Sequence, residues 1–349
     1  MRYSLIVPVF NRPDEVGELL ESLTGQTFRD FEVLIVEDGS SLPCRDVVDR
    51  YSSCLDVKYL LKDNSGPGMS RNYGAERAQG EYLIILDSDV IVPPGYLAEV
   101  ERELNAAPAQ AFGGPDRAHK SFSNVQKAIN YSMTSFFTTG GIRGGKKKMD
   151  KFYPRSFNMG VKASLYKELG GFSDMRFGED IDFSIRIFKS GAECRLFPGA
   201  WVYHKRRTDF RKFFRQVFNS GIARINLYKK YPESLKMVHL LPAVFTIGVM
   251  MLMLLFVAGL LLYGLSGDHM SQSVGFALCE LALLPLLVYS LLLFVCSSFE
   301  NRSILVGLLS VPAAFIQLMG YGAGFICAWW NRCVLGRREY SAFTKNFYK

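Results

Sequence analysis

The stretch Tyr82-Leu83-Ile84-Ile85-Leu86-Asp87-Ser88-Asp89 decides the fold of this 349-residue chain. Its apolar run is short and rich in β-branched and aromatic residues, which predicts a buried strand. Residues i and i+2 of a strand point the same way, so the carboxylates of Asp87 and Asp89 should emerge together. Such a pair at the carboxyl end of a strand suits Mg²⁺ or Mn²⁺ held with substrate phosphates. The alternative is a turn whose aspartates cap a helix over residues 95–105.

The segments before this strand alternate between strand-like and helix-like patterns. This βαβα order predicts an α/β fold with a mostly parallel sheet and helices on both faces. We expect strands at 3–9, 31–37, 57–61 and 82–87, with helices at 14–26, 45–51 and 68–79.

Polar residues follow the predicted strands at the points where they end. Pro8-Val9-Phe10-Asn11-Arg12 ends the first strand, and Glu37-Asp38-Gly39-Ser40 ends the second. Arg71 lies in the first turn of the helix that follows Gly66-Pro67-Gly68. A helix N-terminus with an arginine is an anion site, so we expect these groups to gather with the aspartates along one sheet edge.

The later part of the globular region adds two further candidates. Glu179 and Asp180 start a predicted amphipathic helix that continues over 181–190, where capping is the alternative role. Strands are expected at 157–162 and 194–197, and His204 ends a short strand-like stretch. A surface position is the alternative for this histidine.

The charge balance points to a membrane surface. The formal net charge is +8, and basic residues cluster at 143–151 and 205–215. The second cluster adjoins long apolar runs, so we expect anionic membrane lipids as partners. No nucleic-acid-binding motif is evident, so nucleic acid is not expected as a partner. The first cluster contains glycines and is interpreted either as a loop over phosphate groups or as a plain solvated loop.

Residues 208–232 form an amphipathic segment with an apolar stripe running from Phe210 to Tyr228. In a soluble protein such a stripe is usually core. Because membrane spans follow here, we expect an interfacial helix.

Three apolar segments follow at 240–265, 274–297 and 304–330, each long enough to cross the membrane. Met1-Arg2-Tyr3 leads directly into a strand-like segment, which predicts a cytoplasmic globular part and a multi-pass inner-membrane protein. Three spans would then place the basic tail, residues 332–349, outside, against the positive-inside tendency. Pro312 and nearby glycines make the third segment a candidate for a re-entrant element. Glu280 is expected to face protein or a polar cavity.

Several motifs, taken in order, carry a resemblance to a known family. The chain resembles the family 2 glycosyltransferases with a GT-A (Rossmann-like) fold and C-terminal transmembrane helices. The resemblance covers roughly the first 230 residues. The motifs are Ser4-Leu-Ile-Val-Pro-Val-Phe-Asn11, Val36-Glu-Asp38-Gly-Ser40, Gly68-Met-Ser-Arg71-Asn72-Tyr-Gly-Ala75, the run ending in Asp87-Ser-Asp89, and Gly178-Glu179-Asp180.

The resemblance implies a site for a nucleotide-sugar donor. Asp38 and Arg71 would hold the nucleotide, and the backbone near Pro8 and Phe10 would form the wall beside its nucleobase. Asp87 would contact the nucleotide ribose or the metal.

The resemblance also implies a metal site and a base. Asp89 would ligate Mg²⁺ or Mn²⁺ on the diphosphate, and His204 would approach the metal or the diphosphate. Asp180 would be the general base, with Glu179 beside it. One base without a placed nucleophile implies direct displacement with inversion.

The expected organisation is a GT-A domain over 1–207, the interfacial helix over 208–232, transmembrane helices over 239–331 and the basic tail. The Gln-x-x-Arg-Trp motif of processive members is absent from the sequence, which favours addition of one sugar. The acceptor is expected to be a hydroxyl of a lipid-linked or membrane-proximal glycan, in cell-surface polysaccharide or glycolipid synthesis. Transfer onto polyprenyl phosphate is the runner-up, and a non-catalytic membrane scaffold is a third interpretation. The sequence leaves the sugar, the nucleotide and the oligomeric state open.

Overall fold

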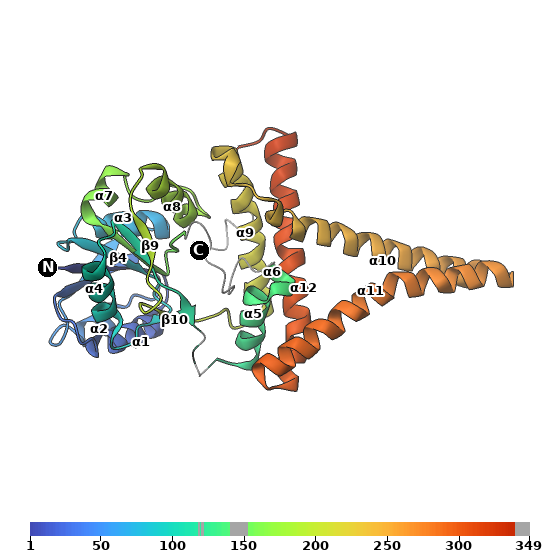
Figure 1. The fold of residues 1–349 in the computed structure, drawn as a ribbon, viewed down its shortest axis with the longest axis horizontal. Coiled ribbons are helices and arrows are strands. Elements are labelled where there is room, and N and C mark those ends of the chain that lie inside the picture. Colours follow the sequence, from blue (N-terminus) through green and yellow to red (C-terminus); the bar gives the residue numbers. More distant parts are fainter. Residues whose placement is uncertain (118, 120–121, 140–152, 339–349) are drawn as a thin grey trace. The chain divides into compact units, whose positions relative to one another are not determined.

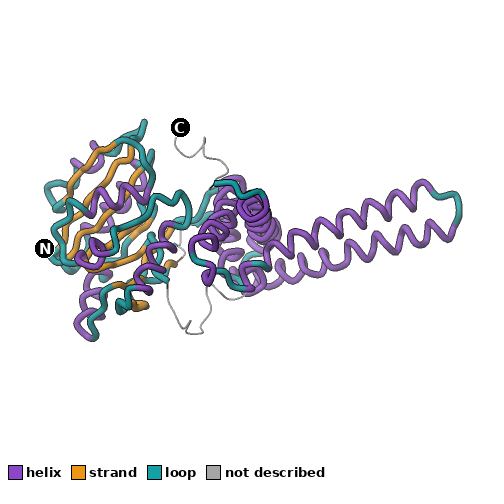
Figure 2. Tube along the Cα trace, turned by 90° about the horizontal axis from the view of Figure 1, so that it is seen from above, coloured by secondary structure: helices purple, strands orange, loops and turns teal. Residues whose placement is uncertain are grey.

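The computed structural model describes residues 1–117, 119, 122–139 and 153–338. These residues divide into two compact units. The first is an α/β unit made of residues 1–119 and 153–205. The second is a helical unit made of residues 122–139 and 206–338 (Figures 1 and 2). The predicted basic loop at 143–151 and most of the basic tail lie outside the described residues.

The α/β unit is built on a seven-stranded sheet with the order β3-β2-β1-β4-β8-β6-β9 (Figure 1). β1, β2, β3 and β4 run parallel, and β8 runs antiparallel to both of its neighbours. The predicted mostly parallel sheet is therefore confirmed. The strands are β1 (Tyr3–Val9), β2 (Phe31–Asp38), β3 (Val57–Lys62), β4 (Tyr82–Leu86), β6 (Ala111–Gly113), β8 (Asn158–Lys162) and β9 (Cys194–Leu196).

Helices bury both faces of this sheet. Successive side chains of β1 alternate between two apolar clusters, Leu5 and Val7 in one and Ile6 in the other. This two-sided burial explains why the strands read as continuous apolar runs in the sequence. One face is covered by α1 (Pro13–Thr24), α2 (Arg45–Asp49) and α4 (Tyr96–Ala106), the other by α3 (Pro67–Ala75), α7 (Ala163–Glu168) and α8 (Glu179–Lys189).

Helix α3 ends at Ala75 rather than at the predicted Gln79. The backbone N–H of Gln79 donates to the buried carboxylate of Glu32 at 2.6 Å, and that of Gly80 donates to Ser4 Oγ at 2.7 Å. These side-chain acceptors replace the helical ones, so the chain leaves the helix early.

The helical unit contains three helices long and apolar enough to cross a membrane, counted over the described residues. They are α10 (Leu241–Leu265), α11 (His269–Asn301) and α12 (Ile304–Trp329), and a π-helical turn, Trp330–Val334, follows α12. The unit also holds α9 (Phe210–Lys230) and two helices not expected from the sequence, α5 (Asn124–Thr134) and α6 (Phe136–Thr139).

The apolar stripe of α9 is covered by protein rather than left bare for lipid. Phe213 and Val217 pack with residues of α5 and α12, and Ile222 and Ile225 pack with α10 and α12. These stripe residues are therefore core, the role that the sequence analysis gave as usual for such a stripe. The helix exposes basic residues at its two ends, Arg211 and Lys212 at one and Lys229 and Lys230 at the other, and its interfacial position stays a prediction.

Helix α12 is continuous, and its glycines have a packing role. A Cβ on Gly324 would lie 2.0 Å from the carbonyl oxygen of Phe218 in α9, and one on Gly322 would lie 2.3 Å from that of Pro242 in α10. The glycine run therefore permits close helix contacts and does not break the helix. The re-entrant interpretation of this segment is not supported.

Glu280 on α11 is exposed within the described residues. Of the two predicted alternatives, protein or a polar cavity, the first is therefore not supported. The side of α11 that packs on α10 carries Gly275 and Cys279, which approach Gly259. Glu280 follows Cys279 directly, so it is turned away from that contact.

Gly160→Ala should destabilise the α/β unit, because a Cβ at this position would lie 2.0 Å from Cζ of Phe112. Phe112 is fully buried and stacks on Phe197, so its ring cannot move aside. We expect the free energy of unfolding to fall by about 1–3 kcal/mol, measured as a lower melting temperature. Gly95→Ala is the control, since no atom lies within 4 Å there. Equal melting of the two variants would contradict this packing.

Candidate active site

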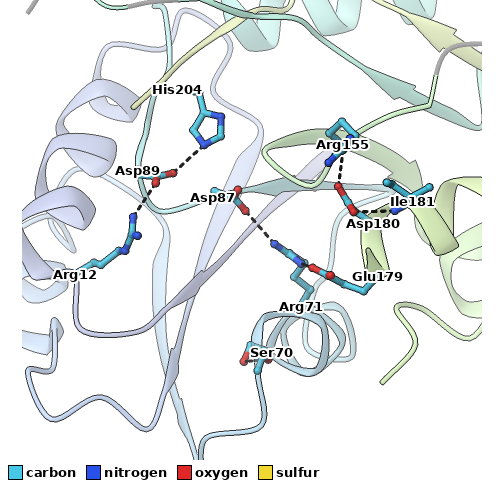
Figure 3. Close-up of polar contacts among 11 residues, drawn as sticks. Arg12, Ser70, Arg71, Asp87, Asp89, Arg155, Glu179, Asp180, Ile181 and His204 are labelled. Carbon is cyan, nitrogen blue, oxygen red and sulfur yellow. Dashed lines mark hydrogen bonds and ion pairs between the residues drawn. The ribbon is translucent and has the colours of Figure 1, made fainter. Parts of the chain in front are cut away.

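Asp87, Asp89 and His204 come together at the carboxyl end of β4 (Figure 3). One potential ligand atom from each lies within 4.8 Å of the others. Two carboxylates and an imidazole are a donor set that suits a divalent cation. The structure therefore groups the three residues that the resemblance assigned to the metal.

A small second sheet places His204 beside the aspartates. Its order is β5-β10-β7, formed by β5 (Val90–Ile91), β10 (Val202–His204) and β7 (Asp116–Arg117). His204 pairs with Val90, and the backbone N–H of Lys205 donates to the carbonyl of Asp89 at 3.1 Å. This pairing leaves His204 Nε2 3.3 Å from Asp89 Oδ1. Sequence separation hides this contact, because more than a hundred residues lie between the two.

The aspartates do not cap the following helix. Helix α4 has Gly95 at its N-cap position and no side-chain capping bond. The alternative interpretation of the pair as a capping turn is therefore wrong.

Arg12 is a site residue that the sequence did not single out. Its Nη1 donates to Asp89 Oδ2 at 2.7 Å (Figure 3). Burial, the largest single influence, opposes the charge on Arg12, but the nearby carboxylates, Asp89 foremost, together outweigh it and raise the pKa of the guanidinium. The only signal in the sequence was its place in the polar run after the first strand.

Arg71 joins the aspartate pair to the acidic start of α8. Its Nη2 lies 3.0 Å from Asp87 Oδ1, and its Nη1 lies 2.9 Å from Glu179 Oε1. The guanidinium is buried and lies over the ring of Phe172, 5.1 Å from the centroid. Its predicted contact with the donor nucleotide stays a prediction.

Asp180 is held by Arg155, which the sequence analysis missed. Arg155 Nε donates to Asp180 Oδ2 at 2.6 Å, and the N–H of Ile181 donates to Oδ1 at 2.8 Å (Figure 3). Burial, the largest single influence, would raise the pKa of the Asp180 carboxyl, but Arg155 together with Arg71 and the Ile181 N–H outweighs burial and lowers it. No sequence pattern around Pro154-Arg155-Ser156 predicts that Arg155 pairs with Asp180.

Glu179 responds differently to the same surroundings. Burial, the largest influence, and the neighbouring Asp180 raise the pKa of its carboxyl despite the ion pair with Arg71. Adjacent carboxyls with pKa values moved in opposite directions can serve different roles. Asp180 is the one that its surroundings keep ionised.

Asp38 builds the turn in front of α3. Its carboxylate accepts from Lys62 Nζ at 2.6 Å and from the N–H groups of Ser65 and Gly66 at 2.9 and 2.8 Å. Pro8 and Phe10 are half-buried where β1 ends. The structure brings these residues to the predicted sheet edge, and their roles toward a nucleotide stay predictions.

The fold and this edge define the class of protein. A mostly parallel sheet with an Asp-x-Asp pair at the end of a central strand is the arrangement of GT-A glycosyltransferases. The model of the family described as "Glycosyl transferase family 2" matches residues 4–170. Residues 4–170 therefore carry a family 2 glycosyltransferase domain, which confirms the resemblance over this part of the chain.

Relatives and solved structures agree with this assignment. An uncharacterised glycosyltransferase of Rickettsia felis is 31% identical over 143 residues, covering 40% of this chain and 23% of that protein. A GalNAc(5)-diNAcBac-PP-undecaprenol beta-1,3-glucosyltransferase of Campylobacter jejuni is 26% identical over 250 residues, covering 69% of this chain and 74% of that protein. The mannosyltransferase PcManGT from Pyrobaculum calidifontis, in complex with GDP-Man and Mn²⁺, has the same fold. Its TM-score is 0.56 at 16% identity, and the match covers 95% of this chain and 88% of that one.

Asp89→Ala should abolish stabilisation of the protein by Mn²⁺, because Asp89 contacts both Arg12 and His204 and has a ligand atom within 4.8 Å of Asp87 and His204. The measurement is the shift in melting temperature on adding Mn²⁺, which should appear in wild type and vanish in the variant. Asp49→Ala, an exposed aspartate of α2, is the control. An Mn²⁺ shift of wild-type size in Asp89→Ala would remove this residue from the metal site.

Proposed function

We propose that this protein is an inverting, metal-dependent glycosyltransferase that moves one sugar from a nucleotide-sugar donor to a hydroxyl of a lipid-linked or membrane-proximal glycan. The observation that carries the proposal is the ion pair of Asp180 with Arg155, next to Glu179, which Arg71 joins to the aspartate pair. A base and a candidate cation site thus belong to one network of charged side chains.

The donor and the cation are inferred from the residues of the strand ends. Asp87, Asp89 and His204 would hold the ion, and the imidazole favours Mn²⁺ over Mg²⁺ because transition metals accept nitrogen ligands more readily. Such an ion, when bound, stabilises the negative charge of a departing nucleoside diphosphate. The complex of PcManGT with GDP-Man and Mn²⁺ supports this donor class.

The chain's own residues perform the remaining tasks. Arg71 fixes Asp87 and Glu179 in place, because each of its Nη atoms donates to one of them. Asp180 would accept the proton of the acceptor hydroxyl as its oxygen attacks the anomeric carbon. With one such base and no second carboxylate assigned as nucleophile, a single displacement follows, and the sugar inverts.

The acceptor class rests on the membrane helices and on one relative. The name of the Campylobacter protein gives an undecaprenol-linked glycan and a β-1,3 linkage. The three apolar helices would keep this enzyme near such a lipid-linked acceptor. Anionic lipids would contact the exposed basic residues of α9, with the catalytic unit on the cytoplasmic side.

The nucleotide can be identified by a donor screen. Melting temperatures of the purified full chain would be measured with UDP-, GDP- and dTDP-sugars in the presence of Mn²⁺. We expect the melting temperature to rise with the sugars of one nucleotide, and we expect this rise to disappear in EDTA. Shifts that persist unchanged in EDTA would contradict metal-dependent donor binding.

Asp180→Asn tests the base directly. If the acceptor is a hydroxyl, the variant should keep donor binding and lose transfer by about 10²–10⁴-fold, the usual worth of a general base. The measurements are the transfer rate and the donor-induced melting shift. Asp174→Asn, an exposed residue of the preceding loop, is the control.

The same variant separates the two enzymatic alternatives. A phosphate acceptor is already ionised and needs no base, so a wild-type rate in Asp180→Asn would favour transfer onto polyprenyl phosphate. Loss of donor binding would instead make Asp180 a donor contact.

Arg155→Met should shift the acid limb of the pH–rate profile to higher pH. In wild type Arg155 lowers the pKa of Asp180, so the carboxylate stays ionised until the pH falls below the ordinary range of an aspartate. Without the guanidinium the strongest influence that lowers this pKa is lost, although Arg71 and the Ile181 N–H remain, so the pKa rises and the base becomes protonated at a higher pH. Arg155→Lys keeps a positive charge and should restore most of the wild-type profile. Identical profiles for wild type and Arg155→Met would show that this ion pair does not tune the base.

A further inference from the structure

Helices α10 and α11 form an antiparallel hairpin whose outer part contacts only itself among the described residues. Their contacts there join Gly259 to Gly275 and Cys279. Both helices are strongly apolar, and only 17% and 11% of their most apolar stretches are buried. Figure 2 shows the hairpin extending away from the other helices of this unit. Such a surface is stable in hydrocarbon and not in water.

The hairpin is long enough to cross a bilayer. The 25 residues of α10 extend about 37 Å, compared with a hydrocarbon core of about 30 Å. Glu280 is the single Asp, Glu, Lys or Arg between Leu241 and Ser298 apart from Asp268 in the turn. One acidic side chain does not outweigh two apolar helices.

Helix α12 has different surroundings from the hairpin, because it lies across the hairpin's base. Ser310 bonds to Ser297 near the end of α11, and Phe315 packs on Phe245 near the start of α10. Figure 1 shows α12 running crosswise to α10 and α11, next to α9 and α5. Its most apolar window is 39% buried, more than twice the value of either hairpin helix.

The contacts between α9 and α12 extend over nearly the whole length of α9. Phe210 packs near Ala313, Gly221 approaches Phe325, and Asn226 bonds to Arg332. The two helices therefore run in the same direction and share one environment. Close packing through glycines on both helices keeps them together.

Helix α9 is too polar for a hydrocarbon environment. It carries Arg211, Lys212, Arg215, Arg224, Lys229 and Lys230, together with three amide side chains. Arg215 and Arg224 are near the middle of the helix, so tilting the helix cannot bring every basic side chain to a membrane surface. If α12 crossed the bilayer, α9 would be carried into it.

We propose that only the α10–α11 hairpin crosses the membrane, and that α12 lies with α9 along the membrane surface at the hairpin's base. The chain then crosses twice, and Arg332, Arg337 and Arg338 remain on the face where α9 lies. The α/β unit is on that same face, because the five residues between His204 and Phe210 are too few to cross a bilayer. The basic residues after α12 then obey the positive-inside tendency.

Single-cysteine variants of the full chain test this topology. In one, the natural Cys54 of the α/β unit is the only cysteine left, and it is exposed. In the other two, all natural cysteines are replaced and either Gly267→Cys, in the hairpin turn, or Leu335→Cys, after α12, is introduced. A membrane-impermeant maleimide is applied to spheroplasts before and after permeabilisation.

We expect Cys54 and the cysteine at 335 to be labelled under the same condition and the cysteine at 267 under the opposite one. Labelling at 335 together with 267, opposite to Cys54, would mean three crossings and would overturn the proposal. Labelling of all three positions under one condition would mean that the hairpin does not cross, and would also overturn it.

Fusions to the C-terminus of the unaltered chain keep the test valid if the cysteine replacements prevent folding. With the α/β unit in the cytoplasm, a fused green fluorescent protein should fluoresce and a fused alkaline phosphatase should be inactive. The reverse pattern would exclude an even number of crossings. Neither experiment depends on the reaction that the enzyme catalyses.

Discussion

The buried guanidinium of Arg71 is the interaction on which the site depends. It bonds to Asp87 at the end of β4 and to Glu179 at the start of α8, two segments far apart in the sequence. A buried charge is stable only when it is paired, and removal of one partner leaves the others uncompensated. The position of α8, and with it that of Asp180, is therefore tied to the aspartate pair.

Arginines balance the acidic groups of this sheet edge one by one. Arg12 pairs with Asp89, Arg71 with Asp87 and Glu179, and Arg155 with Asp180. Unbalanced carboxylates at this density would take up protons, because burial and like charges both disfavour ionisation. The arrangement thus keeps a potential base and potential metal ligands charged inside a partly buried site.

The helical unit is organised by a separation of charge from apolar surface. The hairpin of α10 and α11 contains few polar groups, whereas α9 carries six basic residues. Helix α12 contacts both, and its glycines allow α9 to approach closely on one side and α10 on another. An apolar helix of sufficient length is therefore not by itself a membrane span, because the helices packed against it decide where it can lie.

Much of the α/β unit was predictable because its signals are local. Apolar runs at 3–9 and 31–37 and helical spacing at 14–26 reflect burial on the two faces of one sheet, so period and length alone identify the elements. Asp87 and Asp89 were found because a strand places residues i and i+2 on one side. The predictions that failed have a common cause. The ends of α3, the burial of the α9 stripe and the exposure of Glu280 depend on atoms contributed by distant segments.

The sequence by itself determined the element order, the edge of the sheet where polar groups gather and the apolar character of three late helices. Each of these follows from neighbouring residues through strand and helix periodicity. Only the tertiary structure decided that Arg12 and Arg155 belong to the site, that β10 carries His204 to Asp89 and that α12 packs along α9. Those pairings join residues separated by tens to more than a hundred positions, and backbone periodicity carries no information about which distant side chains meet.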